Sequence, residues 1–158
     1  MFHATRSLPV HDRFWAKVER TPTCWVWLAA KDPNGYGMLT IDKRSTRAHV
    51  VVYGWLYGTI PAGMMIDHTC HNRACVNPTH LRLVTPKQNA ENRGVLNRNN
   101  TSGARGVSWY PHTGKWLAQV KHNGRFVLQA YFDDFDDAAT AARDARARYF
   151  THSGETAA

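Results

Sequence analysis

The segment Met64–Asn89 reads MMIDHTCHNRACVNPTHLRLVTPKQN, and it predicts the fold of the N-terminal half of the chain. Its two short apolar runs, Met64–His68 and Leu81–Val84, predict strands. Thr85 can cap the free N–H groups of a following helix, and Pro86 suits the first helical position. The order strand, loop, strand, helix is a ββα unit. Because such a unit is too small to bury a large core, we expect it to need a cross-link.

The loop between the two strands has the spacing Cys70-x4-Cys75-x4-His80. Thiolates and an imidazole within one short loop are typical ligands of tetrahedral Zn²⁺, and a closed structural site takes four ligands. Cys24 is our candidate for the fourth ligand, although its apolar neighbours also allow it to be a small buried residue. His71 competes for this place, but its adjacency to Cys70 makes chelation by both residues awkward.

Three further polar residues of the segment are not used by this zinc site: Asp67, His68 and Asn89. An imidazole at a strand end can take a proton from a water that attacks phosphorus. Carboxylate and amide oxygens are hard ligands that suit Mg²⁺ on a phosphate substrate. Each residue alone has an ordinary explanation, as a turn former, a strand-end polar residue or a surface helix residue. Together on one ββα unit they favour metal-dependent chemistry on phosphodiesters.

The composition of the chain indicates a globular protein that binds an anionic polymer. Its 158 residues carry a formal charge of +8, its pI is about 9.8, and 43% of its residues are hydrophobic. These values exclude global disorder, collagen and a coiled coil, and they favour nucleic acid as the partner. No apolar run reaches the roughly 18 residues of a membrane span. Because the first residues also lack a signal-peptide pattern, we expect a cytoplasmic, nucleoid-associated protein with no membrane partner.

Changes in composition divide the chain into two predicted domains. Residues 93–104 are polar, rich in Asn and Gly and without an apolar period, so we expect a linker there. One domain then covers residues 1–92 and a second covers 105–150, followed by a disordered tail at 151–158. No acidic residue lies between Glu91 and Asp133, whereas basic residues recur there, which suggests a surface that faces phosphate.

The second domain is predicted to be a three-stranded antiparallel sheet with one helix. The segments Gly106–Tyr110, Lys115–Lys121 and Arg125–Phe132 are rich in aromatic and β-branched residues, and the Asn-Gly pair at 123–124 is a strong hairpin signal. Acidic residues precede the Ala-rich stretch Ala138–Tyr149, as at a helix N-terminus. The chain as a whole is therefore predicted to be α+β.

Alternation along the middle strand separates a core face from a polar face. Trp116, Ala118 and Val120 share one side, on which a helix of small alanines can pack closely. The other side carries Lys115, Leu117, Gln119 and Lys121. Because a ribbon of two or three strands fits the major groove, this polar face is our candidate surface for duplex DNA.

A family resemblance is carried by His68-Thr-Cys70-x4-Cys75-Val-Asn77-Pro78-x-His80-Leu81, followed by Asn89. It continues upstream through Cys24-Trp25, Asn34-Gly35-Tyr36-Gly37, Arg47-Ala48-His49 and Ile60-Pro61-Ala62-Gly63. These motifs, which cover roughly residues 12–93, resemble the zinc-stapled branch of the HNH, or His-Me finger, endonucleases. That family includes homing endonucleases and many phage-encoded enzymes.

The resemblance implies the ββα-metal (His-Me finger) fold and a set of roles. In this family the residue that matches His68 is the general base that activates water, and the residue that matches Asn89 binds the catalytic divalent ion. Some members add the acid before the base as a ligand, which matches Asp67. Structural zinc is held by residues that match Cys24, Cys70, Cys75 and His80.

One position departs from the usual HNH pattern. The residue before Leu81 is ordinarily Asn and is His80 here, which in the zinc-stapled branch is the zinc ligand. The family also often places an Arg near the scissile phosphate. Arg47 is our candidate for this role, and Lys43 and Arg44 are its rivals.

A second resemblance is carried by Arg105-Gly106-Val107, Lys115-Trp116, and Phe132 followed by an Ala-rich helix with Tyr149. These residues resemble an AP2-type DNA-binding domain, which is often fused to homing-type HNH nucleases. The resemblance implies that DNA is contacted by Arg105, Trp109, Lys115, Gln119, Lys121 and Arg125. We add Arg93 and Arg98 from the basic stretch before this domain.

The sequence therefore predicts a metal-dependent endonuclease that hydrolyses phosphodiester bonds in duplex DNA. It would use structural Zn²⁺ and catalytic Mg²⁺ or a similar ion, and would be encoded by a phage or mobile element; homodimerisation stays open. The alternative is a non-catalytic, zinc-stabilised DNA-binding protein, which would not need His68 or Asn89. An RNA-binding module has less support, because the sequence shows no exposed aromatic pair on which bases could stack.

Overall fold

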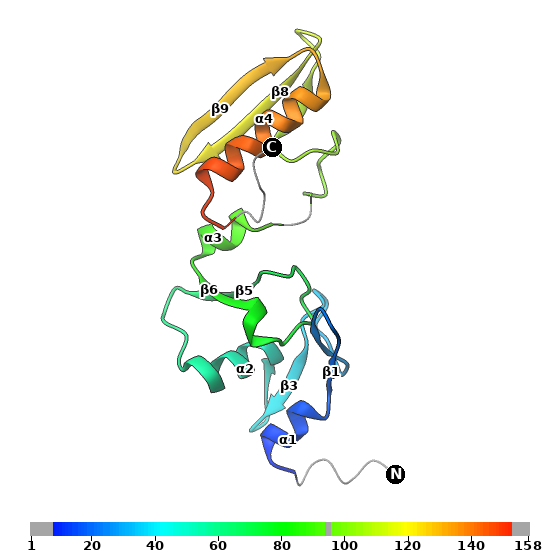
Figure 1. Cartoon of the computed structure of the whole chain (residues 1–158), viewed down its shortest axis with the longest axis vertical. Helices are drawn as coiled ribbons and strands as arrows, with labels where there is room; N and C mark the ends of the chain where they lie inside the picture. Colours follow the sequence, from blue (N-terminus) through cyan, green and yellow to red (C-terminus); the bar gives the residue numbers. More distant parts are fainter. Residues whose placement is uncertain (1–7, 94–95, 153–158) are drawn as a thin grey trace. The chain divides into compact units, whose positions relative to one another are not determined.

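Residues 8–93 and 96–152 are described by a computed structural model, drawn in Figure 1. The chain forms two compact units that divide between Pro86 and Lys87, a few residues before the predicted domain end at residue 92. Among the described residues, no helix combines the length and apolar character needed to cross a membrane.

The first unit consists of antiparallel hairpins and the helices that connect them. In chain order its elements are α1 (Val10–Trp15), β1 (Val18–Arg20), β2 (Trp25–Trp27), β3 (Met38–Ile41), β4 (Arg44–Arg47), α2 (Ala48–Tyr57), β5 (Met65–His68), the 3₁₀ turn η2 (Pro78–His80) and β6 (Leu81–Val84). Strand β1 pairs with β2, β3 with β4, and β5 with β6. The two predicted strands around the cysteine loop are confirmed, with β5 beginning one residue later than expected.

One hydrophobic core joins these elements. Phe14 of α1 and Trp27 of β2 are fully buried, with ring centroids 5.2 Å apart. Val52 of α2, Ile66 of β5 and Leu81 of β6 belong to the same cluster. The core therefore holds the β5–β6 hairpin, which carries the predicted site residues, against the rest of the unit.

Gly37 makes a close approach to this core. A Cβ atom at Gly37 would lie 2.5 Å from Cγ and 2.6 Å from Cδ1 of Trp27. The carbonyl of Gly37 also accepts the N–H of Ala48, the first residue of α2, at 2.8 Å. Glycine is needed at this position because any side chain would displace the Trp27 ring.

The second unit contains a three-stranded antiparallel sheet in the order β7-β8-β9. Helix α4 lies across one face of this sheet (Figure 1). Its elements are α3 (Pro86–Glu91), β7 (Val107–Tyr110), β8 (Lys115–His122), β9 (Arg125–Phe132) and α4 (Phe135–Tyr149). The first residue of α3, Pro86, is the last residue of the first unit, and the rest of the helix belongs to the second. The predicted sheet with one helix is confirmed.

Local chemistry explains the boundaries in this unit. Asn123 and Gly124 both have positive φ, 50° and 79°, which the tight turn between β8 and β9 requires. Asp134 caps α4, since its Oδ1 accepts two backbone N–H groups of the first turn at 2.7 and 3.1 Å. Ala138 and Ala142 are fully buried in the core between α4 and the sheet, as predicted for small alanines.

The predicted linker and tail are only partly described, since residues 94–95 and 153–158 lie outside the described ranges. Within the linker, the hydroxyl of Ser102 donates to the carbonyl of Val107 at 2.7 Å. The first residue assigned to the tail, Thr151, donates from its N–H and its hydroxyl to Oε2 of Glu91, at 3.1 and 3.2 Å. Thr151 is thus hydrogen-bonded to α3 within the second unit.

The contact between Gly37 and Trp27 predicts that Gly37→Ala destabilises the first unit by roughly 1 to 3 kcal/mol, since overpacking a core has that cost. Gly54→Ala is the matched control. A Cβ atom there meets nothing within 4 Å inside α2, so we expect it to be neutral or to stabilise by up to about 1 kcal/mol. Urea unfolding of the zinc-saturated proteins measures both values. Wild-type stability of Gly37→Ala would refute the close approach.

Candidate functional site

Four candidate metal ligands of the first unit form a Cys3His cluster: Cys24, Cys70, Cys75 and His80. Their ligand atoms all lie within 4.8 Å of one another. Nδ1 of His80 is 3.8 Å from Sγ of Cys24 and 3.6 Å from Sγ of Cys75. Around tetrahedral zinc, bonds of about 2.3 Å to sulfur and 2.0–2.1 Å to nitrogen separate the two atoms by about 3.6 Å. The cluster therefore fits a zinc ion in both donor chemistry and spacing.

Backbone pairing between β2 and the cysteine loop brings Cys24 to the other three ligands. The N–H of Val76 donates to the carbonyl of Trp25 at 2.7 Å, and the N–H of Trp27 donates to the carbonyl of Ala74 at 2.8 Å. Cys24 directly precedes this paired strand. It is 9% exposed, so it is a buried residue and a potential ligand at the same time.

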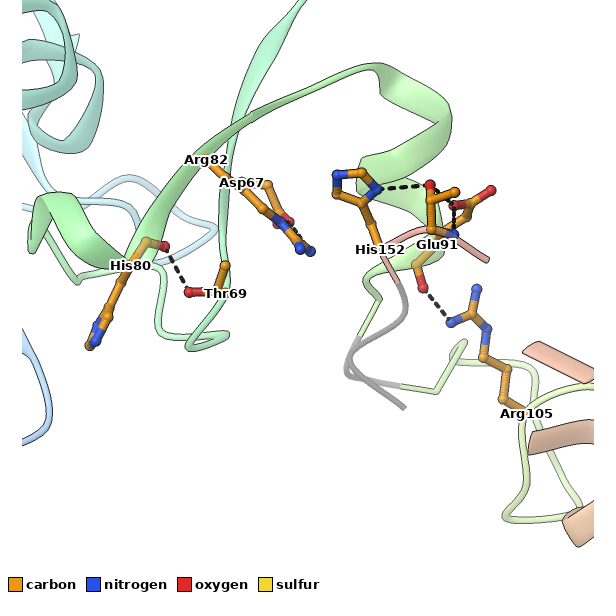
Figure 2. A network of polar contacts seen from close by, with 8 residues as sticks. Asp67, Thr69, His80, Arg82, Glu91, Arg105 and His152 are labelled. Carbon is orange, nitrogen blue, oxygen red and sulfur yellow. Dashed lines mark hydrogen bonds and ion pairs between the residues drawn. The ribbon is translucent and has the colours of Figure 1, made fainter. Parts of the chain in front are cut away.

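Hydrogen bonds around the loop orient its ligands. The carbonyl of His80 accepts the N–H and the hydroxyl of Thr69, at 2.9 and 3.2 Å; Figure 2 shows the hydroxyl contact. The N–H of Asn77 points at Sγ of Cys75 (3.4 Å), a contact that supports a thiolate. His71 is exposed and has a φ of 56°, and it is not part of the cluster.

The thiols of the cluster need a cation in order to ionise. Burial raises the pKa of Cys70, and it raises the pKa of Cys75 to about 12; neighbouring cysteines add to both shifts. Because zinc binds thiolates, zinc binding here releases protons from these thiols.

His68 is the last residue of β5 and is 5% exposed. Its Nε2 lies 3.0 Å from the carbonyl oxygen of Cys75. In the tautomer that donates this hydrogen bond, Nε2 carries the proton and Nδ1 is the basic nitrogen. The cysteine loop thus fixes the ring and favours one tautomer.

The environment of His68 keeps its imidazole neutral. Burial lowers the pKa of His68. The carbonyl of Cys75 and the charge of Asp67 oppose this effect, and the positive charge of Arg73 adds to it. A neutral imidazole can accept a proton, which a general base requires.

Two residues to which the sequence analysis gave no role lie against His68. The ring of His49 is 4.7 Å from that of His68, centroid to centroid, and the ring of Tyr36 is 5.9 Å from it. His49 is 3% exposed, and burial lowers its pKa to about 3. Within the described residues its Nδ1 has no hydrogen-bond partner. Tyr36 and His49 both belong to the upstream motifs through which the sequence resembles HNH endonucleases. That resemblance was the signal from which a role for them could have been inferred.

The two predicted ligands of the catalytic ion differ in their surroundings. Asp67 is 8% exposed, and its Oδ2 is held by Nε and Nη2 of Arg82, each at 2.9 Å (Figure 2). One carboxylate oxygen is therefore engaged by a guanidinium. Asn89 is exposed on α3 in the second unit. Metal binding by either residue stays a prediction.

The predicted phosphate-binding Arg47 is paired with an acid. Its Nε and Nη2 donate to Oδ2 of Asp32 at 3.2 and 3.1 Å. The rivals Lys43 and Arg44 are exposed where the chain turns from β3 into β4.

The predicted DNA-contacting residues divide between the two faces of the second unit's sheet. Residues directly opposite each other on neighbouring strands share a face. Lys115, Gln119 and Lys121 lie on the face away from α4, and Lys115 pairs with Asp133 at 2.9 Å. Trp109 and Arg125 lie on the other face, because their strand partners are Trp116 and His122.

The remaining basic residues of the predicted set lie outside the sheet. Arg105, which was predicted to face DNA, donates from Nη1 to the carbonyl of Glu91 (3.0 Å) and from Nη2 to that of Ala90 (3.1 Å), so its guanidinium contacts the end of α3 (Figure 2). Arg93 donates to the side chain of Asn97. Arg98 is exposed.

The expectation that no aromatic pair is exposed is wrong. Tyr110 and Tyr131 are 36% and 48% exposed, with ring centroids 5.5 Å apart on the face away from α4. Phe126 on the same face is 52% exposed, and Nζ of Lys121 lies 5.6 Å from its ring centroid. This face therefore offers stacking surfaces as well as positive charge.

Comparison with known proteins identifies the class of the domain that contains His68. Residues 46–91 match the HNH endonuclease family, so the chain contains an HNH endonuclease domain that runs from β4 to the end of α3. No solved structure matches the chain.

Three proteins of Escherichia phage T7 are similar to the chain. Protein 7.7 is 35% identical over 68 residues (43% of this chain and 52% of protein 7.7), and protein 2.8 is 36% identical over 67 residues (42% and 46%). The chain thus spans about half the length of these two relatives. Protein 3.8 is 34% identical over 82 residues, which cover 52% of this chain and 67% of protein 3.8. The chain belongs to the same family as protein 3.8.

The Cys3His cluster predicts one tightly bound zinc ion per chain. Cys75→Ser should lose the zinc and unfold the first unit, because the ββα hairpin depends on this cross-link. His71→Asn is the control within the same loop, since Asn tolerates positive φ and His71 is outside the cluster. Metal analysis and circular dichroism on both variants test this. A folded, zinc-free Cys75→Ser protein would contradict it.

Proposed function

We propose that the protein is a metal-dependent endonuclease that hydrolyses phosphodiester bonds in duplex DNA. The observation that carries the proposal is His68, a buried imidazole fixed by the carbonyl of Cys75 within an HNH endonuclease domain. The lowered pKa of His68 supports the assignment, since a base must be neutral before it acts.

In the proposed reaction, Nδ1 of His68 takes the proton of a water molecule as its oxygen attacks phosphorus. The bond from phosphorus to the 3′ oxygen then breaks. A bound Mg²⁺ or similar ion supplies electrostatic stabilisation of the leaving oxygen. Asn89 would hold this ion, with Asp67 as a further ligand, while zinc in the Cys3His cluster would act only on structure.

We assign DNA targeting to the sheet of the second unit, which we propose to be AP2-like. Lys121 and Gln119 stand on the face away from α4, and the exposed Tyr110 and Tyr131 lie on the same face. This combination suits phosphate and base contacts together. The similarity to T7 proteins supports a phage origin.

His68→Ala is expected to lower the cleavage rate by about 100-fold or more, because a general base contributes about that much, and to leave duplex affinity within a few-fold. Cleavage of supercoiled plasmid and of a random-sequence DNA library with Mg²⁺ measures the rate. His71→Asn, from the same loop, is the matched control and should cleave like the wild type.

Two results would count against this assignment. A His68→Ala variant that cleaves normally removes His68 from the mechanism. A wild-type protein that holds zinc and binds duplexes tightly, but cleaves neither substrate, supports the non-catalytic alternative.

Lys121→Ala is expected to weaken duplex binding and to reduce the slope of log affinity against log salt by about 1, as the loss of one phosphate contact does. Arg148→Ala is the matched control, since Arg148 is exposed on α4, which covers the opposite face. Titration of duplex and single-stranded oligonucleotides at several salt concentrations measures the effect.

Equal losses in both variants would show that the protein's net charge, and not this face, governs binding. A preference for single strands would assign the face to base stacking.

A further inference from the structure

The ring of Tyr36 borders four functional groups of the first unit. Cζ of Arg47 lies 4.4 Å and Cζ of Arg73 lies 5.6 Å from its centroid. The imidazoles of His49 and His68 lie 5.2 and 5.9 Å from it. One aromatic ring therefore has two guanidinium groups and the proposed general base around it.

The turn that carries Tyr36 is fixed by hydrogen bonds. Oδ1 of Asp32 accepts the N–H groups of Asn34 and Tyr36 at 2.9 and 3.0 Å. The carbonyl of Asn34 accepts from Nη1 of Arg73 at 3.0 Å. Gly35, with a φ of 90°, allows the chain to turn between them. Tyr36 and Arg73 are thus held in place by the same turn.

The two guanidinium groups differ in how their charge is compensated. Arg47 is bound through two nitrogens to the carboxylate of Asp32. Burial opposes ionisation of Asp32, but the N–H groups of its own turn and Arg47 outweigh it and lower its pKa, so the acid is charged and neutralises Arg47. Among the described residues, no carboxylate pairs with the exposed Arg73.

We propose that Arg73, and not Arg47, binds the phosphodiester that His68 attacks. This inference rests on the proposed function and names a further substrate-binding residue for it. Arg73 uses Nη1 for the carbonyl of Asn34, and a guanidinium has five N–H donors, so donors remain for two phosphate oxygens. Tyr36 is the positioning residue, because its ring lies beside both the guanidinium and the imidazole.

The location of Arg73 also connects phosphate binding with zinc. Arg73 lies between Cys70 and Cys75, and Cys75 supplies the carbonyl that holds His68. One loop, which zinc would close through the Cys3His cluster, therefore presents the proposed phosphate-binding residue and orients the proposed base.

The test compares Arg73→Ala with Arg47→Ala in the full chain, since both remove one positive charge beside the same ring. Single-turnover cleavage with Mg²⁺ should fall by about 100-fold in Arg73→Ala, the effect of losing one transition-state donor, and by much less in Arg47→Ala. Arg73→Lys should fall between wild type and Arg73→Ala, because Lys keeps the charge but lacks the bidentate fork.

A second readout separates phosphate binding from cleavage. In the His68→Ala background, Arg73→Ala should weaken duplex binding and reduce the salt slope by about 1, whereas Arg47→Ala should change both less. Zinc content and urea unfolding, measured on every variant, confirm that the fold is retained.

A larger cleavage loss in Arg47→Ala than in Arg73→Ala, at equal zinc content and stability, would overturn the assignment in favour of Arg47. If the wild type cleaves no DNA, the proposed function fails, and the binding readout then decides the phosphate contact by itself. Unchanged duplex affinity and an unchanged salt slope in Arg73→Ala would overturn the assignment of Arg73 as the phosphate-binding residue.

Discussion

The first unit depends on the backbone pairing between β2 and the cysteine loop. The two hydrogen bonds that join Trp25 to Val76 and Trp27 to Ala74 bring Cys24 to ligands that lie far along the chain. The same pairing buries Trp27, whose ring requires glycine at position 37. A zinc ion in the cluster would reinforce this pairing, because its four ligands come from both segments. Short hairpins with little core of their own need such a cross-link.

Burial near this loop governs the chemistry that its residues can perform. His68 and His49 are both almost completely buried, which disfavours the charged imidazole and leaves a neutral ring able to accept a proton. Arg73 is exposed on the same loop and retains its charge. The loop therefore offers a neutral base and a cation close together, a combination that suits attack on an anionic phosphodiester. Among the described residues, Nδ1 of His49 has no hydrogen-bond partner, which is unusual for a buried polar atom.

Most of the secondary structure could be predicted because its signals are local. The Asn-Gly turn at 123–124 and the Asp134 cap depend on neighbouring residues, and the structure has both. The alternation of β8 holds for Ala118 and Val120 on the core face, whereas Leu117 on the opposite face is also buried. The gathering of the loop ligands with Cys24 could be anticipated from residue types and spacing. Contacts set by register or tertiary packing could not. The Tyr110–Tyr131 pair, the hold of Arg82 on Asp67 and the approach of Tyr36 to His68 join residues whose separation in sequence carries no signal.

Helix α3 shows why the limits of a family match and of a compact unit need not coincide. The HNH match extends to residue 91, whereas the units divide before Lys87. Six residues are too few for a helix to be stable alone in water. Its stability must come from tertiary contacts, and those of Glu91 with Thr151 and of Arg105 with the carbonyls of Ala90 and Glu91 lie in the second unit. Asn89, the proposed ligand of the catalytic ion, is therefore on a helix that the second unit orders.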